Sequence, residues 1–290
     1  MKGIDRHIAN KRIERNCYPG EQWLYIKIYG GLTTCDQLLV EVIYPAIEGL
    51  IRSKVIVDWF FIRYYDPDFH LRIRLELSSK DKMMMALNAM NRHLLPLCRH
   101  RRLNKVIIDT YERELERYGK KSMVITERLF CLDSHCICQL LTHLLHKGKG
   151  SERWRLAFLW VDTVLDALGF DLNQKMGLIK KMSEAYLAEF GYNEHNIKPL
   201  ARRYRHLRDE ITQILQYHTV DSESIDVIRI HCAKIKKNLN IVDAKQLNVS
   251  SLLHMSMNRL FVSQNRLNEL VLYYCLERYY RKEVKTQRKD

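Results

Sequence analysis

The stretch at residues 70–77, HLRIRLEL, alternates polar and apolar residues at every position. Alternation with a period of two is the pattern of a β-strand, because successive side chains point to opposite faces of a sheet. A shift of one residue in the pairing would exchange the two faces, so the pattern strongly restricts how this strand can lie. One face then carries Leu71, Ile73, Leu75 and Leu77, and the other carries His70, Arg72, Arg74 and Glu76.

The segments around this strand predict an α+β fold. Pro45 indicates a kink or an early end in the first helix, and Asp66-Pro67-Asp68 indicates a turn. The resulting β-α-β-β-α-β order is typical of a ferredoxin-like (split βαβ) unit and predicts one antiparallel sheet in the N-terminal half. Strands are expected at 23–30, 57–65, 70–78 and 105–112, and helices at 32–51 and 80–98.

The second half is predicted to be helical almost throughout. Ser151 is a candidate cap for a helix that ends before Gly169, and Asp171 or Asn173 for one that ends before Gly191. The stretch HKGKGSE (146–152) is the best candidate for a boundary. We expect a ferredoxin-like half over 1–147 and a helical half over 148–290 packed on it. Further helices are expected over 199–218, 222–239 and 264–282. Because no flexible linker separates the halves, they should form one cooperative unit.

Composition restricts the class of protein and its compartment. The chain has 290 residues, of which 47% are apolar and 28% are charged, enough for a sizeable core. The longest apolar runs are far shorter than the roughly 20 residues that span a bilayer, and the N-terminus has no apolar signal segment. We therefore expect a cytoplasmic protein without membrane insertion. Its eight cysteines should then be reduced thiols.

Metal and nucleotide cofactors are not expected. The cluster CLDSHCIC (131–138) lacks the paired CxxC half-sites of a zinc module. The chain also lacks GxGxxG, Walker-type, HExxH and GxSxG motifs. The net charge of +14 attracts anions without choosing among nucleic acids, acidic peptides and carboxylates. The basic stretches at 99–105 and 278–290 are interpreted as solvated surface.

Three stretches carry polar residues that could act chemically. Arg72 and Arg74 lie about 6.5–7 Å apart along a strand, so their planar forks can converge on a dicarboxylate or an oxyanion. A solvent-facing sheet with ordinary ion pairs is the alternative. The stretch YERELERYG (111–119) contains Arg117 and also fits a charged turn. His254 and Asn258 share a helix face, where His254 is either a proton-transfer group or a core histidine.

An ordered set of motifs resembles the elimination domain of lantibiotic dehydratases, which also occurs in thiopeptide-type bacteriocin biosynthesis proteins. The opening WLYIKIYG and the pair WFFIRYYDPDFHLRIRLEL resemble the start of that domain, and YERELERYG resembles its next motif. FCLDSHC follows, and SLLHMSMNRLF with a helix bearing Glu269 and RYY resembles the closing motif. Lys120 stands where the family usually has a second glycine. The resemblance extends from Gln22 to Tyr280.

The resemblance implies a lyase that eliminates glutamate from glutamylated Ser or Thr residues of a ribosomally synthesised precursor peptide, giving dehydroalanine or dehydrobutyrine. By motif, Arg72 and Arg74 would bind the glutamyl group and the oxyanion, and Arg117 would contact a second carboxylate. His254 would transfer the proton. The remaining polar positions of these motifs, Arg63, His70 and Asn258, would contact the substrate, and no metal or cofactor is implied.

The resemblance also implies partners. The chain lacks the large glutamylation domain, so a separate glutamylating subunit that uses glutamyl-tRNA is expected beside the precursor peptide; a homodimer is left open. A pyridine-forming cyclase of thiopeptide pathways is an alternative on the same scaffold. A non-catalytic tRNA-binding module is a further alternative, although an RNA-reading sheet displays aromatics where Arg72 and Arg74 stand. We expect Arg72, Arg74, Arg117 and His254 to meet in one pocket above the sheet.

Overall fold

The computed structural model describes residues 13–148, 150–239 and 246–287. The chain divides into two compact units: Met1–Cys138 with Lys245–Leu252, and Gln139–Ala244 with Leu253–Asp290. These divisions fall inside helix α6 (Met123–His146) and helix α11 (Val249–Leu260), so both helices contribute to both units.

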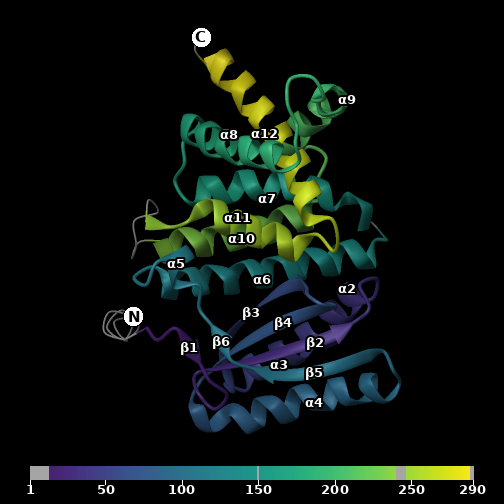
Figure 1. Ribbon diagram of the computed structural model, residues 1–290, viewed down its shortest axis with the longest axis vertical. Helices are drawn as coiled ribbons and strands as arrows, with labels where there is room; N and C mark the ends of the chain where they lie inside the picture. Colours follow the sequence, from purple (N-terminus) through teal and green to yellow (C-terminus); the bar gives the residue numbers. More distant parts are fainter. Residues whose placement is uncertain (1–12, 149, 240–245, 288–290) are drawn as a thin grey trace. The chain divides into compact units, whose positions relative to one another are not determined.

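The first unit contains a four-stranded antiparallel sheet in the order β3-β4-β2-β5 (Figure 1). A two-stranded sheet joins β1 (Asn16–Cys17) to β6 (Tyr111–Glu112). Together with the helices, these sheets confirm the predicted α+β class. The strands of the larger sheet are β2 (Trp23–Gly30), β3 (Ile56–Tyr65), β4 (Phe69–Leu77) and β5 (Leu103–Asp109).

The helical segment between β2 and β3 is interrupted near Pro45, as predicted. It consists of α2 (Cys35–Gln37), a π-helical segment η1 (Leu38–Ile43) and α3 (Tyr44–Arg52). Proline has no N–H and its ring crowds the carbonyl four residues earlier, so a regular α-helical hydrogen bond cannot form there. The wider π-helical turns place this break just before Pro45, which occupies the first turn of α3.

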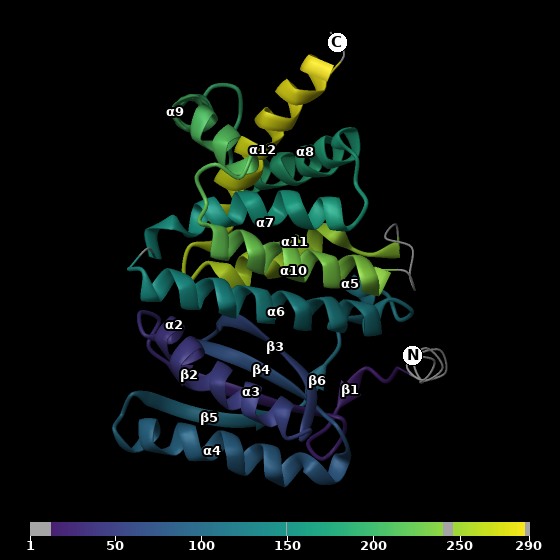
Figure 2. The same cartoon turned by 180° about the vertical axis from the view of Figure 1, so that it is seen from behind.

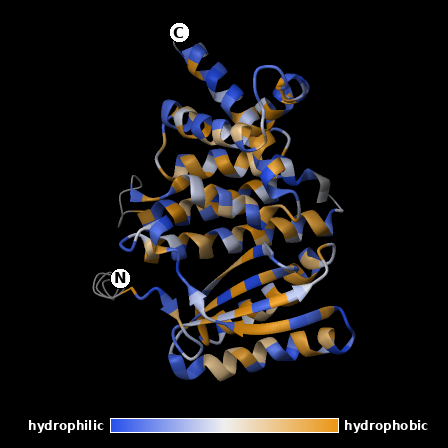
Figure 3. Ribbon diagram, in the orientation of Figure 1, coloured by the Kyte–Doolittle hydropathy of each residue, from blue (hydrophilic) through white to orange (hydrophobic). Residues whose placement is uncertain are grey.

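The apolar face of β4 belongs to the core. Leu71 and Ile73 pair with Ile28 and Ile26 of β2, and all four side chains are at most 1% exposed. Figure 3 shows the alternation of apolar and polar residues along these strands. Helices α3 and α4 (Met83–Arg99) lie along one side of the sheet, with η2 (Lys80–Lys82) leading into α4 (Figure 2).

The polar face of β4 is largely buried, so the alternative interpretation of its pattern as a solvent-facing sheet surface is wrong. His70 is fully buried and Arg74 is only 7% exposed. The ring of Phe60, opposite Arg74 on β3, lies 5.4 Å from the ring of Phe130 in α6. The first part of α6 therefore covers this face.

The second unit is helical. Asp171 caps α8 through a reciprocal capping box with Gln174, which confirms one predicted cap. Helix α7 instead has Glu152 as its N-cap residue, one position after the predicted Ser151. Besides parts of α6 and α11, the unit contains η3 (Gly150–Glu152), α7 (Arg153–Ala167), α8 (Leu172–Glu189), α9 (Lys198–Leu215), α10 (Ser222–Leu239) and α12 (Asn265–Gln287). Over the described residues, no helix has both the length and the apolar character needed to cross a membrane.

Candidate active site

Arg72 and Arg74 lie on the same face of β4, as their spacing predicts. Arg72 pairs with Lys27 of β2 and Ile62 of β3. Arg74 pairs with Tyr25 of β2 and Phe60 of β3. Because β4 lies between two strands, the position of each arginine is fixed by backbone pairing on both sides.

Arg74 lies among three aromatic rings. Its guanidinium carbon is 4.6 Å from the ring centre of Tyr25, 5.1 Å from that of Phe60 and 4.7 Å from that of Tyr111. Arginine stays charged when it is buried, and each desolvated cation–π contact contributes roughly 0.5–2 kcal/mol. The burial also raises the pKa values of Tyr25 and Tyr111 above the usual phenol range, so both remain neutral. Arg74 thus supplies a fixed positive charge in a region of low polarity.

Arg72 is held by a histidine and a tyrosine. Its Nε donates to Nε2 of His70 at 3.0 Å, and its guanidinium carbon lies 3.3 Å from the ring centre of Tyr64. The ring of His70 stacks on that of Tyr29, with 4.4 Å between centroids. His70, which the motif comparison placed among the substrate-binding residues, has no exposed surface and contacts Arg72 directly.

Arg72 and Arg117 line one cleft of about 490 Å³ within the first unit. Lys27 and Asp109 form an ion pair in its wall. That pair lowers the pKa of Asp109 and raises the pKa of Lys27, so both stay charged near neutral pH. The cleft is lined by Arg15, Tyr25, Lys27, Arg72, Asp109, Thr110, Glu112, Arg113, Glu114, Glu116 and Arg117.

Arg117 lies in the short helix α5 (Leu115–Tyr118) and keeps part of its side chain accessible. Its Nε donates to Ser251 Oγ at 3.0 Å, and its Nη1 donates to Glu114 at 3.0 Å. The amide of Asn248 donates to its carbonyl oxygen at 3.1 Å. These contacts orient the guanidinium while leaving donors for a ligand.

The turn after Arg117 needs a glycine at one position only. Gly119 has a φ of 77°, in the left-handed region that favours glycine. Lys120, where the family usually has a second glycine, is not among the residues with positive φ. A lysine at this position is therefore compatible with the turn.

Arg63 and Arg113 have buried carboxylate partners. Nη2 of Arg63 lies 2.6 Å from Asp36 Oδ1, which fastens α2 to β3. Arg63 is 3% exposed, and the structure places it in this ion pair rather than in the cleft wall. Arg113 binds Glu127 of α6 through two nitrogens, at 2.7 and 3.2 Å.

His254 belongs to a hydrogen-bonded group in the second unit. Its Nδ1 lies 2.9 Å from Oε1 of Glu269, which is fully buried. Tyr186 and Tyr273 donate their hydroxyls to Glu269 at 2.5 and 3.3 Å, and Arg266 donates to the hydroxyl oxygen of Tyr186 at 2.7 Å. The carboxylate therefore holds the imidazole through Nδ1, so a proton transferred by this ring would be carried by Nε2.

The predicted residues fall into two sets. Arg72, Arg74 and Arg117 belong to the first unit, whereas His254 and the half-buried Asn258 belong to the second. The sequence reading missed Tyr25, Lys27 and Asp109 on the cleft and Tyr186 beside Glu269. The first two were detectable, since alternation along WLYIKIYG puts Tyr25 and Lys27 on one face. Asp109 and Tyr186 could not be detected in this way, because their partners Lys27 and Glu269 lie far from them in the sequence.

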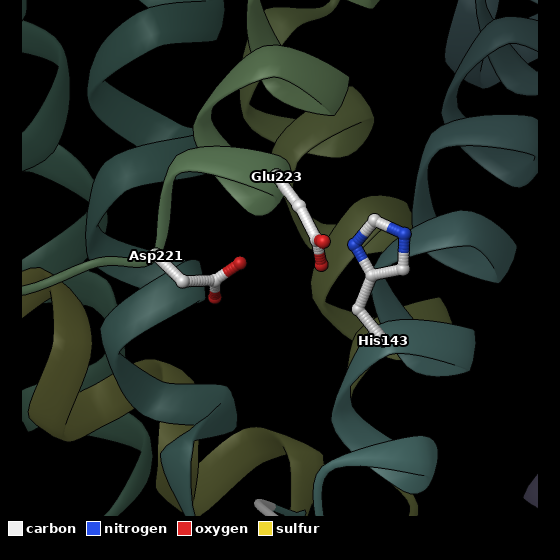
Figure 4. Close-up of side chains that lie close together, drawn as sticks. All are labelled: His143, Asp221 and Glu223. Atoms are coloured by element: carbon white, nitrogen blue, oxygen red, sulfur yellow. The ribbon is translucent and has the colours of Figure 1, made fainter.

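One group of possible metal ligands occurs in the described part of the chain. His143, Asp221 and Glu223 have ligand atoms within 4.8 Å of one another (Figure 4). The ammonium of Lys147 already binds Asp221 at 3.2 Å and Glu223 at 2.7 Å. Asp221 also accepts the backbone N–H of Ser224 in the first turn of α10. A metal ion would have to displace Lys147, so a helix cap with an ion pair explains the group.

The sequence relatives of this chain are much longer proteins. It is 25% identical over 264 residues to the subtilin biosynthesis protein SpaB of Bacillus subtilis, covering 89% of this chain and 25% of that protein. It is 25% identical over 286 residues to the nisin biosynthesis protein NisB of Lactococcus lactis subsp. lactis, covering 93% of this chain and 27% of that protein. The chain thus spans about a quarter of these relatives.

Two solved structures share the fold. The tRNA-dependent lantibiotic dehydratase MibB from Microbispora sp. 107891 aligns with a TM-score of 0.61 at 20% identity, over 93% of this chain and 29% of that one. The pyridine synthase TbtD from thiomuracin biosynthesis aligns with a TM-score of 0.64 at 14% identity, over 88% of this chain and 96% of that one. Residues 23–280 match the family model described as lantibiotic biosynthesis dehydratase C-term. The chain therefore belongs to the family of lantibiotic dehydratase C-terminal domains.

Proposed function

We propose that this protein eliminates glutamate from glutamylated Ser or Thr residues of a ribosomally synthesised precursor peptide. The observation that carries the proposal is the cleft of the first unit, which is lined by Arg72, Arg117 and Lys27. A glutamyl ester has a free carboxylate, and an arginine fork is its matching donor. Family membership supports the same role in lantibiotic or thiopeptide biosynthesis.

The reaction needs a base, cations that bind the glutamyl group, and a positive charge that stabilises the transition state. A base removes the proton from Cα of the modified residue, the electron pair forms the Cα=Cβ bond, and the Cβ–O bond breaks to release glutamate as a carboxylate. His254 is the proposed base, and Arg72 and Arg117 bind the free carboxylate of the glutamyl group and the carboxylate that forms as the Cβ–O bond breaks.

Arg74 supplies positive charge for the transition state. The negative charge that develops on the peptide carbonyl is stabilised best by cations that are already fixed and poorly solvated. The aromatic surroundings of Arg74 meet this requirement. The loss of one such group typically lowers the rate by about 10²–10³-fold. His254, in the second unit, is proposed to act on the same substrate.

The proposal includes a partner and a compartment. The proposed partner is a glutamylating subunit that uses glutamyl-tRNA and attaches the glutamate to the precursor peptide. Aminoacyl-tRNA is a cytoplasmic reagent, which supports the proposal that the protein acts in the cytoplasm. We also propose that the N-terminal half is a ferredoxin-like (split βαβ) unit, an assignment that the strand order β3-β4-β2-β5 supports. We further propose that it folds cooperatively with the helical half.

A pyridine-forming cyclase is the second candidate. The observation in its favour is the fold: the chain aligns with the pyridine synthase TbtD with a TM-score of 0.64, beside 0.61 for the dehydratase MibB. A cyclase would join two dehydroalanines and would not require glutamate recognition. Arg72 and Arg117 on one cleft therefore favour elimination.

The test uses the purified chain and two peptides. The first carries a glutamyl ester on serine, and the second is already dehydrated at two positions. Release of free glutamate and formation of dehydroalanine from the first peptide support elimination. Ring formation from the second peptide, without reaction of the first, would replace this proposal with the cyclase.

A further inference from the structure

A second cleft lies between α9 and α12, within the second unit, and shares no residue with the cleft that contains Arg72. Its volume is about 680 Å³. The charged residues that line it are Arg208, Asp209, Arg278, Arg281, Lys282 and Lys285. Five of these are cations and one is a carboxylate, so the lining carries a net charge of +4.

The cations form a regular row on α12, and α9 adds one further cation, Arg208, to the same cleft. On α12 a cation occurs at every third or fourth residue, which gives about one cation for each 5.4 Å turn. These cations are Arg278, then Arg281 and Lys282, then Lys285. On α9, Tyr204, Arg208 and Thr212 recur every four residues and line the same cleft. A row of cations along α12, with Arg208 and two hydroxyl side chains on α9, fits a linear anion with repeated charges better than a single small anion.

Nearby carboxylates orient part of this surface without neutralising it. Glu277 is 5% exposed and forms ion pairs with Arg281 and, at 3.4 Å, with Arg278. The guanidinium of Arg278 also lies 4.9 Å from the ring centre of Tyr274. Lys285 has no acidic partner among the described residues, and Lys282 has only Glu283 at 3.9 Å. The cleft therefore keeps exposed positive charge beside arginines that are already ordered.

We propose that the α9–α12 cleft binds the sugar–phosphate backbone of RNA. Arginine forks and threonine hydroxyls are common donors to phosphate oxygens, and the regular charges of a nucleic-acid backbone match rows of cations. The choice of RNA over an acidic peptide rests on the proposed function, because the glutamylating partner would use glutamyl-tRNA. The cleft would bind glutamyl-tRNA, or the tRNA that remains after glutamate transfer, on the same protein that carries out the elimination.

The test measures binding of tRNA to the full chain by fluorescence anisotropy over a salt series from about 50 to about 200 mM. Each phosphate contact should contribute a slope of about −0.7 to −0.9 to the plot of log affinity against log salt. The variant K282E/K285E should bind tRNA at least about tenfold more weakly and reduce that slope by roughly 1.4–1.8, the share of two contacts. Both side chains are exposed, so folding should be retained.

The matched control is K180E/K181E, which makes the same change of net charge on exposed residues of α8. It should bind tRNA within about threefold of the wild-type protein. Equal loss in both variants, or equal binding of duplex DNA, acidic peptide or anionic vesicles, would overturn the proposal. Elimination from a glutamylated peptide, measured separately, should be unchanged in K282E/K285E. A wild-type protein that binds tRNA but releases no glutamate would refute the proposed function, not the RNA cleft.

Discussion

The Nε–H of Arg72 donates a hydrogen bond to Nε2 of His70, with 3.0 Å between the nitrogens. Nδ1 of His70 lies 2.9 Å from the carbonyl oxygen of Asp68. A neutral imidazole satisfies both contacts in one tautomer, with the proton on Nδ1 and the lone pair on Nε2. Burial is the main cause that lowers the pKa of His70, and the charge of Arg72 lowers it further. The neutral ring thus fixes the direction of Arg72 in the cleft.

Stability should depend on pH through His70. Because its pKa is lowered in the folded protein, the unfolded chain takes up this proton at a higher pH than the folded chain does. The stabilisation is complete above about 6.5, the ordinary histidine value, and decreases as the pH falls below it. His70→Gln keeps a hydrogen-bond acceptor but cannot be protonated. In urea unfolding from about pH 7 to about pH 5, the wild type should lose more stability than this variant. Identical pH profiles for the two proteins would contradict the assignment.

Arg72→Lys should keep the fold and lose most of the activity. Lysine retains the charge but has no planar fork for a carboxylate and no Nε–H for His70. We expect kcat/KM for a glutamylated peptide to fall by about 10²-fold or more, with glutamylated peptide accumulating. Arg102→Lys, at an exposed position before β5, is the matched control and should keep wild-type activity. Full activity of Arg72→Lys would remove Arg72 from the site.

The sequence was sufficient for elements whose pattern is local. The strand predicted at residues 23–30 occurs at Trp23–Gly30, and α10 at Ser222–Leu239 matches its predicted span. Alternation also placed Arg72 and Arg74 on one face correctly. These features depend on neighbours one to four positions away, which a single sequence displays directly.

The surroundings of the site depend on distant parts of the chain. Arg74 is buried because Tyr111 and the first part of α6 cover a face that pattern alone could have left open to solvent. Glu269 reaches His254 from the next helix, α12, across the break between α11 and α12. Tyr186 joins them from a position 83 residues before Glu269. The periodicity of a single helix or strand does not predict contacts between distant elements, so only the resemblance to the family's closing motif pointed to Glu269.

Metal removal should leave the activity unchanged. Lys147 occupies both carboxylates beside His143, and the thiol of Cys136 is fully buried in α6. We expect the purified protein to eliminate glutamate at the same rate before and after dialysis against a chelator. Stoichiometric zinc that is lost together with activity in Cys136→Ser would show that a metal is required.

Unfolding should occur in one step. Helices α6 and α11 each contribute residues to both compact units, so melting one unit removes part of the other. Calorimetry should give a single transition whose van't Hoff enthalpy equals the calorimetric enthalpy. Two separate transitions would mean that the units fold independently.

Glu269→Gln should reduce the chemical step with little effect on substrate binding. The carboxylate of Glu269 accepts from Nδ1–H of His254, which in the neutral ring puts the lone pair on Nε2 and fixes its direction. An amide of the same size can present its NH₂ group to Nδ1, which favours the other tautomer and moves the proton to Nε2. A lost general base typically costs about 10²–10⁴-fold in rate, so kcat should fall by that factor while KM changes little. Tyr273→Phe, which removes only a 3.3 Å contact to the same carboxylate, is the control and should retain most activity. A Glu269→Gln variant with wild-type kcat would exclude His254 as the base held by this carboxylate, whereas a parallel loss in Tyr273→Phe would indicate a purely structural role.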